Sequence, residues 1–504
     1  MMTNTAFKTY TQENGGRVLL LLLLFSLALY QLTTSGIPGL ALVCVIPALV
    51  IFVYLAFKYR LFVFWILCVV NYIIHFRGFD IPFPMSLPNE MLEIILLAIA
   101  LIDIKDSHFE RCANLMLFML IIWCGFCTLE ILNDTCNIGI QFSAWYANAR
   151  RTAFQILYCF LVYILYITTP RNLINYLYVW GGLSLFAAFW VWKQQTLGFT
   201  PSELAWLESH PTHILQGGTL IRYYSFYSDA AAFGIGMAST AVAYLIFAAT
   251  AKIIKFRIIF GVIGLISLWA MFPSGTRTAT VCFFAGIFVY VFLSKSIKIA
   301  IPITILGLFA FFILAFTNIG QGNQQIRRMR TTFDRSDASS NVRDYHKQAI
   351  KKYLQDAPWG MGIANSSDNV PANNKFNILS RIPPDSEYVW IWVHMGIIGI
   401  TVFLITTFFM FAGACWIVLF KLKNPSLRGI GAGFCCAFVS IQLGGYGNQI
   451  LMQFPNCVLY YGGLSLVYAL PFIEKEWIEW EAKELAIQEE KKRLKLEKKR
   501  ASRV

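Results

Sequence analysis

The sequence predicts an all-α polytopic membrane protein with about 12–14 transmembrane helices. Three observations support this class: the 504-residue chain is 57% hydrophobic, only 13% of it is charged, and apolar runs recur along its length. A soluble protein could not bury that much apolar surface. A β-barrel is excluded because the apolar runs are continuous and do not alternate.

The candidate spans follow one another from the first residues onward. Crossing the hydrocarbon takes about 20 apolar residues, and several runs are shorter than this. The first run is expected to be a retained helix and not a signal peptide, since no small-residue cleavage site is convincing. The runs are 18–33, 39–57, 61–74, 91–102, 113–132, 153–168, 173–192, 230–250, 258–273, 278–293, 299–317, 396–420, 429–445 and 456–473.

Short basic loops predict the orientation. Lysines and arginines cluster at 58–60, 252–257, 295–298 and 421–428, and such loops stay on the cytoplasmic side. Both termini are then inside, and the loops near 77–90, 133–152, 194–228, 274–277 and 318–388 are outside. The formal net charge of +14 therefore reflects topology and is no sign of nucleic-acid binding.

Four regions are expected along the chain: an N-terminal transmembrane bundle (1–317), a long outer loop (318–388), C-terminal spans (389–473) and a charged helical tail (474–504). In the outer loop, 341–356 has an apolar stripe at helical spacing, and Ser340 or Asn341 could cap it. The tail is expected to lie on the inner membrane surface, anchored by Trp477 and Trp480, or else to bind a partner.

The 12 cysteines and the motifs suggest neither a metal nor a nucleotide site. Most cysteines lie within apolar runs, where free thiols behave as small hydrophobic groups. The CxxC of Cys124 and Cys127 stands alone inside a span, without a second pair or histidines at zinc spacing. No P-loop is present, so nothing indicates an ATPase.

Arg277 stands between two apolar runs in the stretch FPSGTRTATVCFF (272–284). Ser274 or Thr276 could cap the helix that follows. An arginine and the N–H groups at a helix start together favour an anion such as phosphate. The alternative is an arginine that reaches to lipid headgroups.

Further charges are expected at the same outer face. RYYSFYSDAAAFG (222–234) places Arg222 beside tyrosines and Asp229 at the edge of a span, where an acid usually has a partner or a task. An ion pair of Arg222 with Asp229 is the simpler interpretation. Two further groups lie around the outer loop: Arg343 with Tyr345 and His346, and Asp385 with Glu387 after a double proline.

Three of these stretches resemble the O-antigen ligase and O-antigen polymerase superfamily of bacterial cell-envelope glycosyltransferases. SGTRTATV (274–281) resembles its Ser-Gly-Ser-Arg segment, 222–234 resembles its arginine, aromatic, Asp-Pro-Asn, Phe-Gly segment, and 341–364 resembles its external arginine helix and Pro-x-Gly-x-Gly turn. The resemblance covers about 220–400 well, and the rest of the chain only in hydropathy.

The resemblance implies a GT-C-like, metal-independent enzyme in the bacterial inner membrane, without a cofactor. It would take a glycan from undecaprenyl diphosphate at the periplasmic face, among membrane lipids, and transfer it to a glycolipid acceptor. Arg222, Arg277 and Arg343 would bind the diphosphate and stabilise the leaving group. Supporting contacts are expected from Asp229, Ser274, Thr276, Tyr345 and Arg150.

The sequence departs from the family pattern at two places. The family's usual histidine before the last spans is absent, so Asp385, then Glu387, then His346 are the candidates for the general base. Ala230 and Ala231 replace its Pro-Asn, so the family's side-chain contacts are not expected from those positions.

Two other functions compete with a ligase. A polymerase would use the same donor chemistry and differ only in its acceptor. A lipid-linked sugar flippase or secondary transporter would instead be expected to place charges near the membrane midplane and to show internal symmetry, and the sequence shows neither.

Overall fold

The computed structural model describes residues 15–77, 86–215, 220–295, 297–317, 319, 322, 327, 338–382, 384 and 386–501. The chain divides into two units, residues 1–66 and 67–504. In the first unit, α2 (Gly15–Lys58) is interrupted at Gly36, whose φ of 67° only glycine adopts readily. The next helix, α3 (Arg60–Ile73), begins in the first unit and ends in the second.

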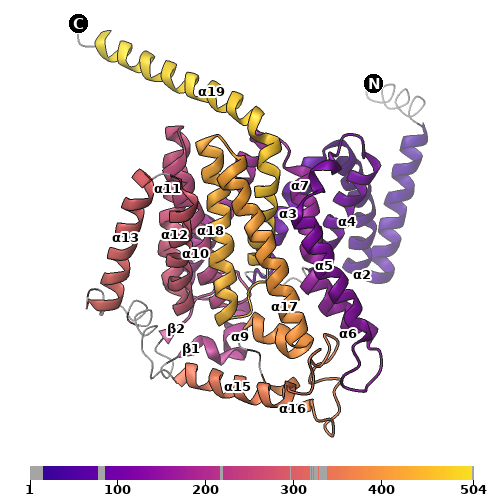
Figure 1. The fold of residues 1–504 in the computed structure, drawn as a ribbon. Coiled ribbons are helices and arrows are strands. Elements are labelled where there is room, and N and C mark those ends of the chain that lie inside the picture. Colours follow the sequence, from indigo (N-terminus) through magenta and orange to yellow (C-terminus); the bar gives the residue numbers. More distant parts are fainter. Residues whose placement is uncertain are drawn as a thin grey trace. The chain divides into compact units, whose positions relative to one another are not determined.

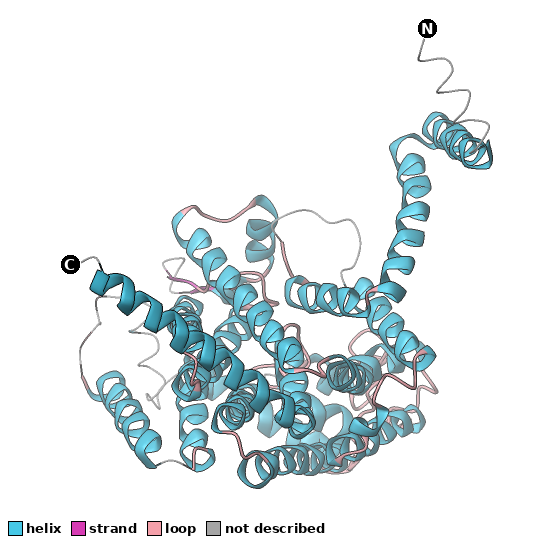
Figure 2. Ribbon diagram, turned by 90° about the horizontal axis from the view of Figure 1, so that it is seen from above, coloured by secondary structure: helices cyan, strands magenta, loops and turns pink. Residues whose placement is uncertain are grey.

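The second unit is built from helices that run back and forth between two ends (Figure 1). Most of its described residues are helical, and the strand pair is small (Figure 2). Its principal elements are α4 (Ser86–Ile102), α5 (Leu115–Leu129), α6 (Phe142–Ala149), α7 (Gln155–Tyr166), α8 (Pro170–Thr196), α9 (Pro201–Ser209), β1 (Ile214–Leu215), β2 (Leu220–Ile221), α10 (Ala230–Thr250), α11 (Ile254–Met271), α12 (Arg277–Leu293), α13 (Ile297–Phe316), α15 (Ala338–Leu354), α16 (Asn377–Arg381), α17 (Glu387–Trp416), α18 (Pro425–Gly447) and α19 (Gly463–Ala501).

Seven helices in the described part are long and apolar enough to cross a membrane, or eight if one bent pair counts as a span. The all-α polytopic class is thereby confirmed. The number is lower than the predicted 12–14 because several apolar helices are short; α12, for example, has 17 residues. About 20 residues are needed to span the hydrocarbon without local adjustment.

Helix α10 forms the centre of the second unit, against α11, α12 and α18. Its most apolar window is 94% buried. Alanines and glycines along it allow neighbouring helices to approach closely, as is typical of membrane helices. At the α18 contact, a Cβ at Gly433 would overlap the Phe247 ring, so a larger residue there would push the two helices apart.

The two ends of this unit differ in character. Helices α6, α9, α15 and α16 and both strands gather at one end, called here the α15 end (Figure 1). The basic turns near 252–257 and 421–428 and the far part of α19 lie at the opposite end. This grouping matches the loops that the sequence places on one side. The sequence predicted the outer helix at 341–356. In the structure it starts three residues earlier, at Ala338, and ends two residues earlier, at Leu354.

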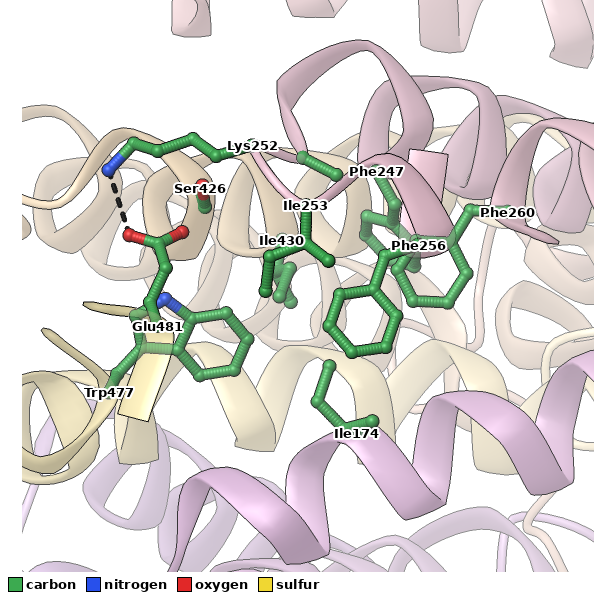
Figure 3. A pocket seen from close by; sticks show the side chains of 11 residues that line it. Ile174, Phe247, Lys252, Ile253, Phe256, Phe260, Ser426, Ile430, Trp477 and Glu481 are labelled. Atoms are coloured by element: carbon green, nitrogen blue, oxygen red, sulfur yellow. Dashed lines mark hydrogen bonds and ion pairs between the residues drawn. The ribbon is translucent and has the colours of Figure 1, made fainter. Parts of the chain in front are cut away.

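The tail is anchored by side chains at the opposite end. Glu481 accepts hydrogen bonds from Lys252 Nζ (2.8 Å) and Asn424 Nδ2 (2.8 Å), and Trp477 is buried beside it (Figure 3). The cavity there is only about 20 Å³, enough for a water molecule but not for a substrate. The predicted membrane anchoring by Trp477 is therefore wrong, because this side chain packs against other helices.

Candidate active site

Arg222 joins the two arginine-bearing stretches at the α15 end. Its guanidinium donates to the Ser274 carbonyl (Nε, 3.4 Å) and to Thr276 Oγ1 (Nη2, 3.1 Å). The Tyr223 N–H donates to the Pro273 carbonyl (3.2 Å), and Thr276 Oγ1 donates to the Ala230 carbonyl (3.0 Å). Segments 222–230 and 273–276 are thus connected by side-chain and backbone hydrogen bonds.

The turn between α11 and α12 depends on its local sequence. Pro273 and Ser274 form a short 3₁₀ turn after α11, and Gly275 follows with φ 56°. That left-handed conformation is costly for residues with a Cβ. Gly234 on α10 faces this turn, and a Cβ there would overlap the Ser274 side chain. Two glycines therefore bring the turn directly against the first turns of α10.

Arg277 is the first residue of α12 and is half-buried. A helix start presents N–H groups without intrahelical partners and the positive end of the helix dipole. Thr276 occupies the N-cap position, but its hydroxyl bonds Ala230 and Arg222 instead of capping the helix. The Ser274 hydroxyl donates to the Met271 carbonyl (2.7 Å) and is likewise part of the turn.

Asp229 caps α10. Its Oδ1 accepts from the N–H groups of Ala231 (2.7 Å) and Ala232 (2.8 Å). This explains the acid at the edge of a span, because an N-cap carboxylate satisfies orphan donors and complements the helix dipole. Asp229 is thus held by its own helix, and the Arg222 guanidinium donates to the α11–α12 turn.

Helix α15 carries Arg343, Tyr345 and His346. The backbone of Arg343 lies one helical turn before Lys347, while its side chain lies outside the described part of the structure. Lys347 Nζ donates to Tyr446 Oη (3.3 Å) and lies 4.9 Å from the centre of that ring. Tyr345 is 72% exposed and His346 is half-buried.

Glu387, one of the three predicted bases, is the first residue of α17. Glu387 is buried, and its Oε2 accepts from the Leu451 N–H (3.2 Å). Arg151 attracts it electrostatically, and the Arg151 guanidinium lies 5.2 Å from the centre of the Trp390 ring. Asp385 lies outside the described residues.

The segment from Tyr446 to Asn456, which comprises the end of α18 and the loop after it, was missed by the sequence analysis. It contacts all the predicted motifs. Its Gln453 accepts from the Ser228 hydroxyl, Gln449 donates to the Pro384 carbonyl, and a Cβ at Gly447 would lie 2.8 Å from Thr278 Oγ1. The only sequence signal is a run of amides, NQILMQFPN (448–456), between two apolar runs. This segment, called here the amide loop, connects α10, α12, α15 and α17.

Arg77 is a second residue that the sequence analysis missed. Its guanidinium donates to the carbonyls of Tyr227 (3.0 Å) and Ser228 (3.4 Å) and lies 4.3 Å from the centre of the Trp206 ring. Burial lowers the pKa of Arg77, and the nearby charge of Asp229 opposes that shift. Arg77 therefore supports the loop that carries Arg222 to the site.

Burial also keeps a histidine of this region neutral. Burial, together with the positive charge of Arg222, lowers the pKa of His213 from 6.5 to about 4. The neutral Nε2 accepts from the Ala230 N–H (3.3 Å), and the His213 carbonyl accepts from the Arg222 N–H (2.9 Å). His213 thus holds Arg222 and the start of α10 together.

Arg150 forms an ion pair with Glu90 of α4. No group of three or more histidine, cysteine, aspartate or glutamate side chains suited to a metal ion occurs among the residues that the structure describes. Within the described chain, the site is therefore built from arginines, hydroxyls and amides.

The fold and this site define a polytopic membrane protein with a cationic, hydroxyl-lined site at one end of its bundle. Residues 262–404 match the family model described as O-antigen ligase. The match confirms the resemblance to the O-antigen ligase and polymerase superfamily, whose members are membrane glycosyltransferase-type enzymes. It includes Arg277, Arg343 and Glu387 but not Arg222. No curated protein matches the chain.

Proposed function

We propose that this protein is an O-antigen ligase-type glycosyltransferase. It transfers a polysaccharide from undecaprenyl diphosphate to a lipid A-core glycolipid at the periplasmic face of the bacterial inner membrane. The observation that carries the proposal is the hydrogen-bonded junction of Arg222 with Thr276, which places one arginine beside another, Arg277, at a helix start.

This junction suits a diphosphate. Guanidinium groups bind phosphate oxygens with paired, charge-assisted hydrogen bonds, and the start of α12 adds the positive end of a helix dipole. Arg343, on α15, would supply the third guanidinium group that binds the diphosphate. Its neighbour Lys347 contacts Tyr446, and Gly447 packs on Thr278 beside Arg277.

The transfer breaks the bond between the anomeric carbon and the diphosphate oxygen. An acceptor hydroxyl forms the new bond at that carbon and gives its proton to a general base. The bond electrons leave with undecaprenyl diphosphate, and the arginines stabilise the charge that develops there. No metal ion is needed in this scheme.

The base is proposed among Asp385, Glu387 and His346. Asp385 immediately precedes the N-cap residue Ser386 of α17, and Glu387 follows it. Because Glu387 accepts a hydrogen bond from the amide loop, its replacement by glutamine should also disturb that loop. Asp385→Asn, which keeps the shape of the side chain, is therefore the sharper test of the base.

The first test is Arg277→Ala in purified protein. The assay mixes an undecaprenyl-diphosphate glycan with a lipid A-core acceptor in the presence of EDTA and follows the glycosylated acceptor. Removing a preorganised donor of this kind costs about 10²–10³-fold in rate, and Arg277→Lys should restore a small part of it. Arg171→Ala is the matched control, because Arg171 is an exposed arginine in the first turn of α8.

The outcomes separate the candidate functions. Wild-type activity in Arg277→Ala would contradict the binding of the diphosphate by Arg277. Transfer to a second lipid-linked repeat, but not to lipid A-core, would identify a polymerase. In cells, deletion of a ligase should leave long chains on the carrier lipid, whereas deletion of a polymerase should leave single repeats on the core. No product with either acceptor would favour a transporter.

A further inference from the structure

A cavity of about 500 Å³ lies at the α15 end, apart from the arginines. It opens where α5 ends and η2 (Glu130–Leu132) begins, and Trp359 closes its other side. Its volume falls within the range of about 300–1,000 Å³ that is typical of small-molecule sites. Nothing in the proposed transfer chemistry uses it.

One wall of the cavity is aromatic. Phe126 stacks on Trp359 with ring centres 6.2 Å apart and planes 13° from parallel. Trp123 stacks behind Phe126 at 5.9 Å and 12°. Trp359 is 50% exposed, so the end of this column of rings offers its surface to a ligand.

The other wall is polar and acidic. It carries the carboxylates of Glu130 and Asp134, the amide of Asn133 and the hydroxyl of Thr135. Asn133 Nδ2 donates to Glu130 Oε2 (2.9 Å), and Asp134 Oδ1 accepts from two turn N–H groups. Glu130 is 4% exposed and lies behind Asn133, whereas Asp134 is exposed. A carboxylate has about four lone-pair sites, so Asp134 keeps the capacity to accept further hydrogen bonds.

The charge of the lining selects the class of ligand. Neither lysine nor arginine is among the residues that line this cavity, and the exposed carboxylate of Asp134 would repel a phosphate. The arginine cluster has the opposite charge and suits the diphosphate. A neutral ligand with many hydroxyls and one apolar face fits both walls of the cavity.

Backbone hydrogen bonds fix the position of Trp359, and no ligand in the cavity is needed for this. Trp359 lies in the turn 357–362, where Met361 N–H donates to the Val393 carbonyl (2.9 Å) and Gly362 N–H to the His394 carbonyl (2.8 Å). Its own carbonyl accepts from Asn133 Nδ2 (2.8 Å). The aromatic and polar walls are therefore held together before any ligand binds, which lowers the entropic cost of binding.

We propose that this cavity binds a pyranose ring of a glycan. The C–H face of the sugar stacks on Trp359, and its hydroxyls donate to Asp134. In the enzyme the ring belongs either to the acceptor or to a distal part of the donor glycan. Its use in transfer rests on the proposed function, whereas sugar binding itself does not.

The test is binding of simple methyl glycosides (a hexose, an N-acetylhexosamine and a 6-deoxyhexose) to the full-length protein. Saturation-transfer NMR is recorded in a detergent without a sugar headgroup, since such headgroups would compete. At least one glycoside should show transfer to its ring C–H protons. Trp359→Ala should weaken its binding about tenfold, and Trp359→Phe should retain part of it.

Trp416→Ala is the matched control, because Trp416 is 58% exposed at the other end of α17. The absence of transfer from all the glycosides would overturn the proposal, and so would equal transfer in Trp359→Ala. Binding that Trp416→Ala weakens just as much would also overturn it.

A kinetic experiment identifies the source of the sugar and separates the two proposals. If the acceptor supplies the ring, Trp359→Ala raises the KM for the acceptor; if the donor supplies it, the KM for the donor rises. An unchanged KM for both substrates would overturn a role in transfer. Glycoside binding by a protein without transferase activity would leave the sugar site standing and contradict the proposed function alone.

Discussion

The Thr276 hydroxyl links Arg222 to the start of α10. Thr276 lies 54 residues from Arg222 in the chain, yet its Oγ1 accepts from that guanidinium and donates to the Ala230 carbonyl. Thr276 is buried, so the loss of these bonds would leave Arg222 and Ala230 without those partners. Its role is to position Arg222, not to contact the reacting atoms.

We predict that Thr276→Val weakens binding of the donor. A lost hydrogen bond to a charged group costs about 1.5–3 kcal/mol, which corresponds to a roughly tenfold to hundredfold loss in kcat/KM. The change should appear mainly in the KM for the lipid diphosphate, and Thr276→Ser should restore it. Wild-type kinetics in Thr276→Val would show that Arg222 is held by other contacts.

His213 makes stability depend on pH. An unfolded chain binds a proton at this histidine near pH 6.5, whereas the folded site does so only near pH 4. The stabilising contribution is therefore complete above pH 6.5 and is lost as the pH falls toward 4. At pH 5 the loss is on the order of 2 kcal/mol.

The measurement is thermal unfolding of wild type and His213→Gln at pH 7 and pH 5. The glutamine cannot take up a proton in this range, so its melting temperature should fall less between the two conditions. Equal falls in both proteins would assign the pH dependence to other groups, His75 among them, since burial also lowers the pKa of His75 to about 4.

At the scale of elements, α17 is shaped by a break that its hydropathy does not reveal. Gly396 has φ 64° within an apolar helix, and the turn 357–362 docks there. A Cβ at Gly396 would overlap the Pro358 carbonyl. The turn that carries Trp359 therefore packs against α17 at this break.

We expect Gly396→Ala to destabilise the protein by about 2–4 kcal/mol, from left-handed backbone strain together with steric overlap. Gly125→Ala on α5 is the control, because nothing lies within 4 Å of its Cβ position. The control should be neutral or slightly stabilising. Thermal unfolding of both variants is followed by circular dichroism. Equal melting temperatures would contradict the close packing of the turn 357–362 against Gly396.

At the scale of the whole molecule, the basic turns and the far part of α19 share one end of the second unit, and α15 and α16 share the other. From the positive-inside rule we predict that the α15 end faces the periplasm. Of the cysteines that the structure describes, Cys415 is half-buried and the rest are buried, so introduced thiols can report the orientation.

We predict that Asn373→Cys reacts with a membrane-impermeant maleimide in cells whose outer membrane has been made permeable. Glu490→Cys should react only after the inner membrane is also opened, because α19 would end in the cytoplasm. Both side chains are exposed. Wild type measures the background from native thiols, and the reverse pattern would contradict the proposed site orientation.

The sequence alone determined the membrane class, the grouping of loops by side and the arginine stretches, because hydropathy and charge act over short distances along the chain. It did not determine the amide loop, the role of Asp229, or the burial of Trp477. Those depended on which helices pack together: Ser228 and Gln453 meet although they are 225 residues apart. Only tertiary structure could decide such contacts, because the free energy that selects them comes from packing between distant helices and not from local sequence pattern.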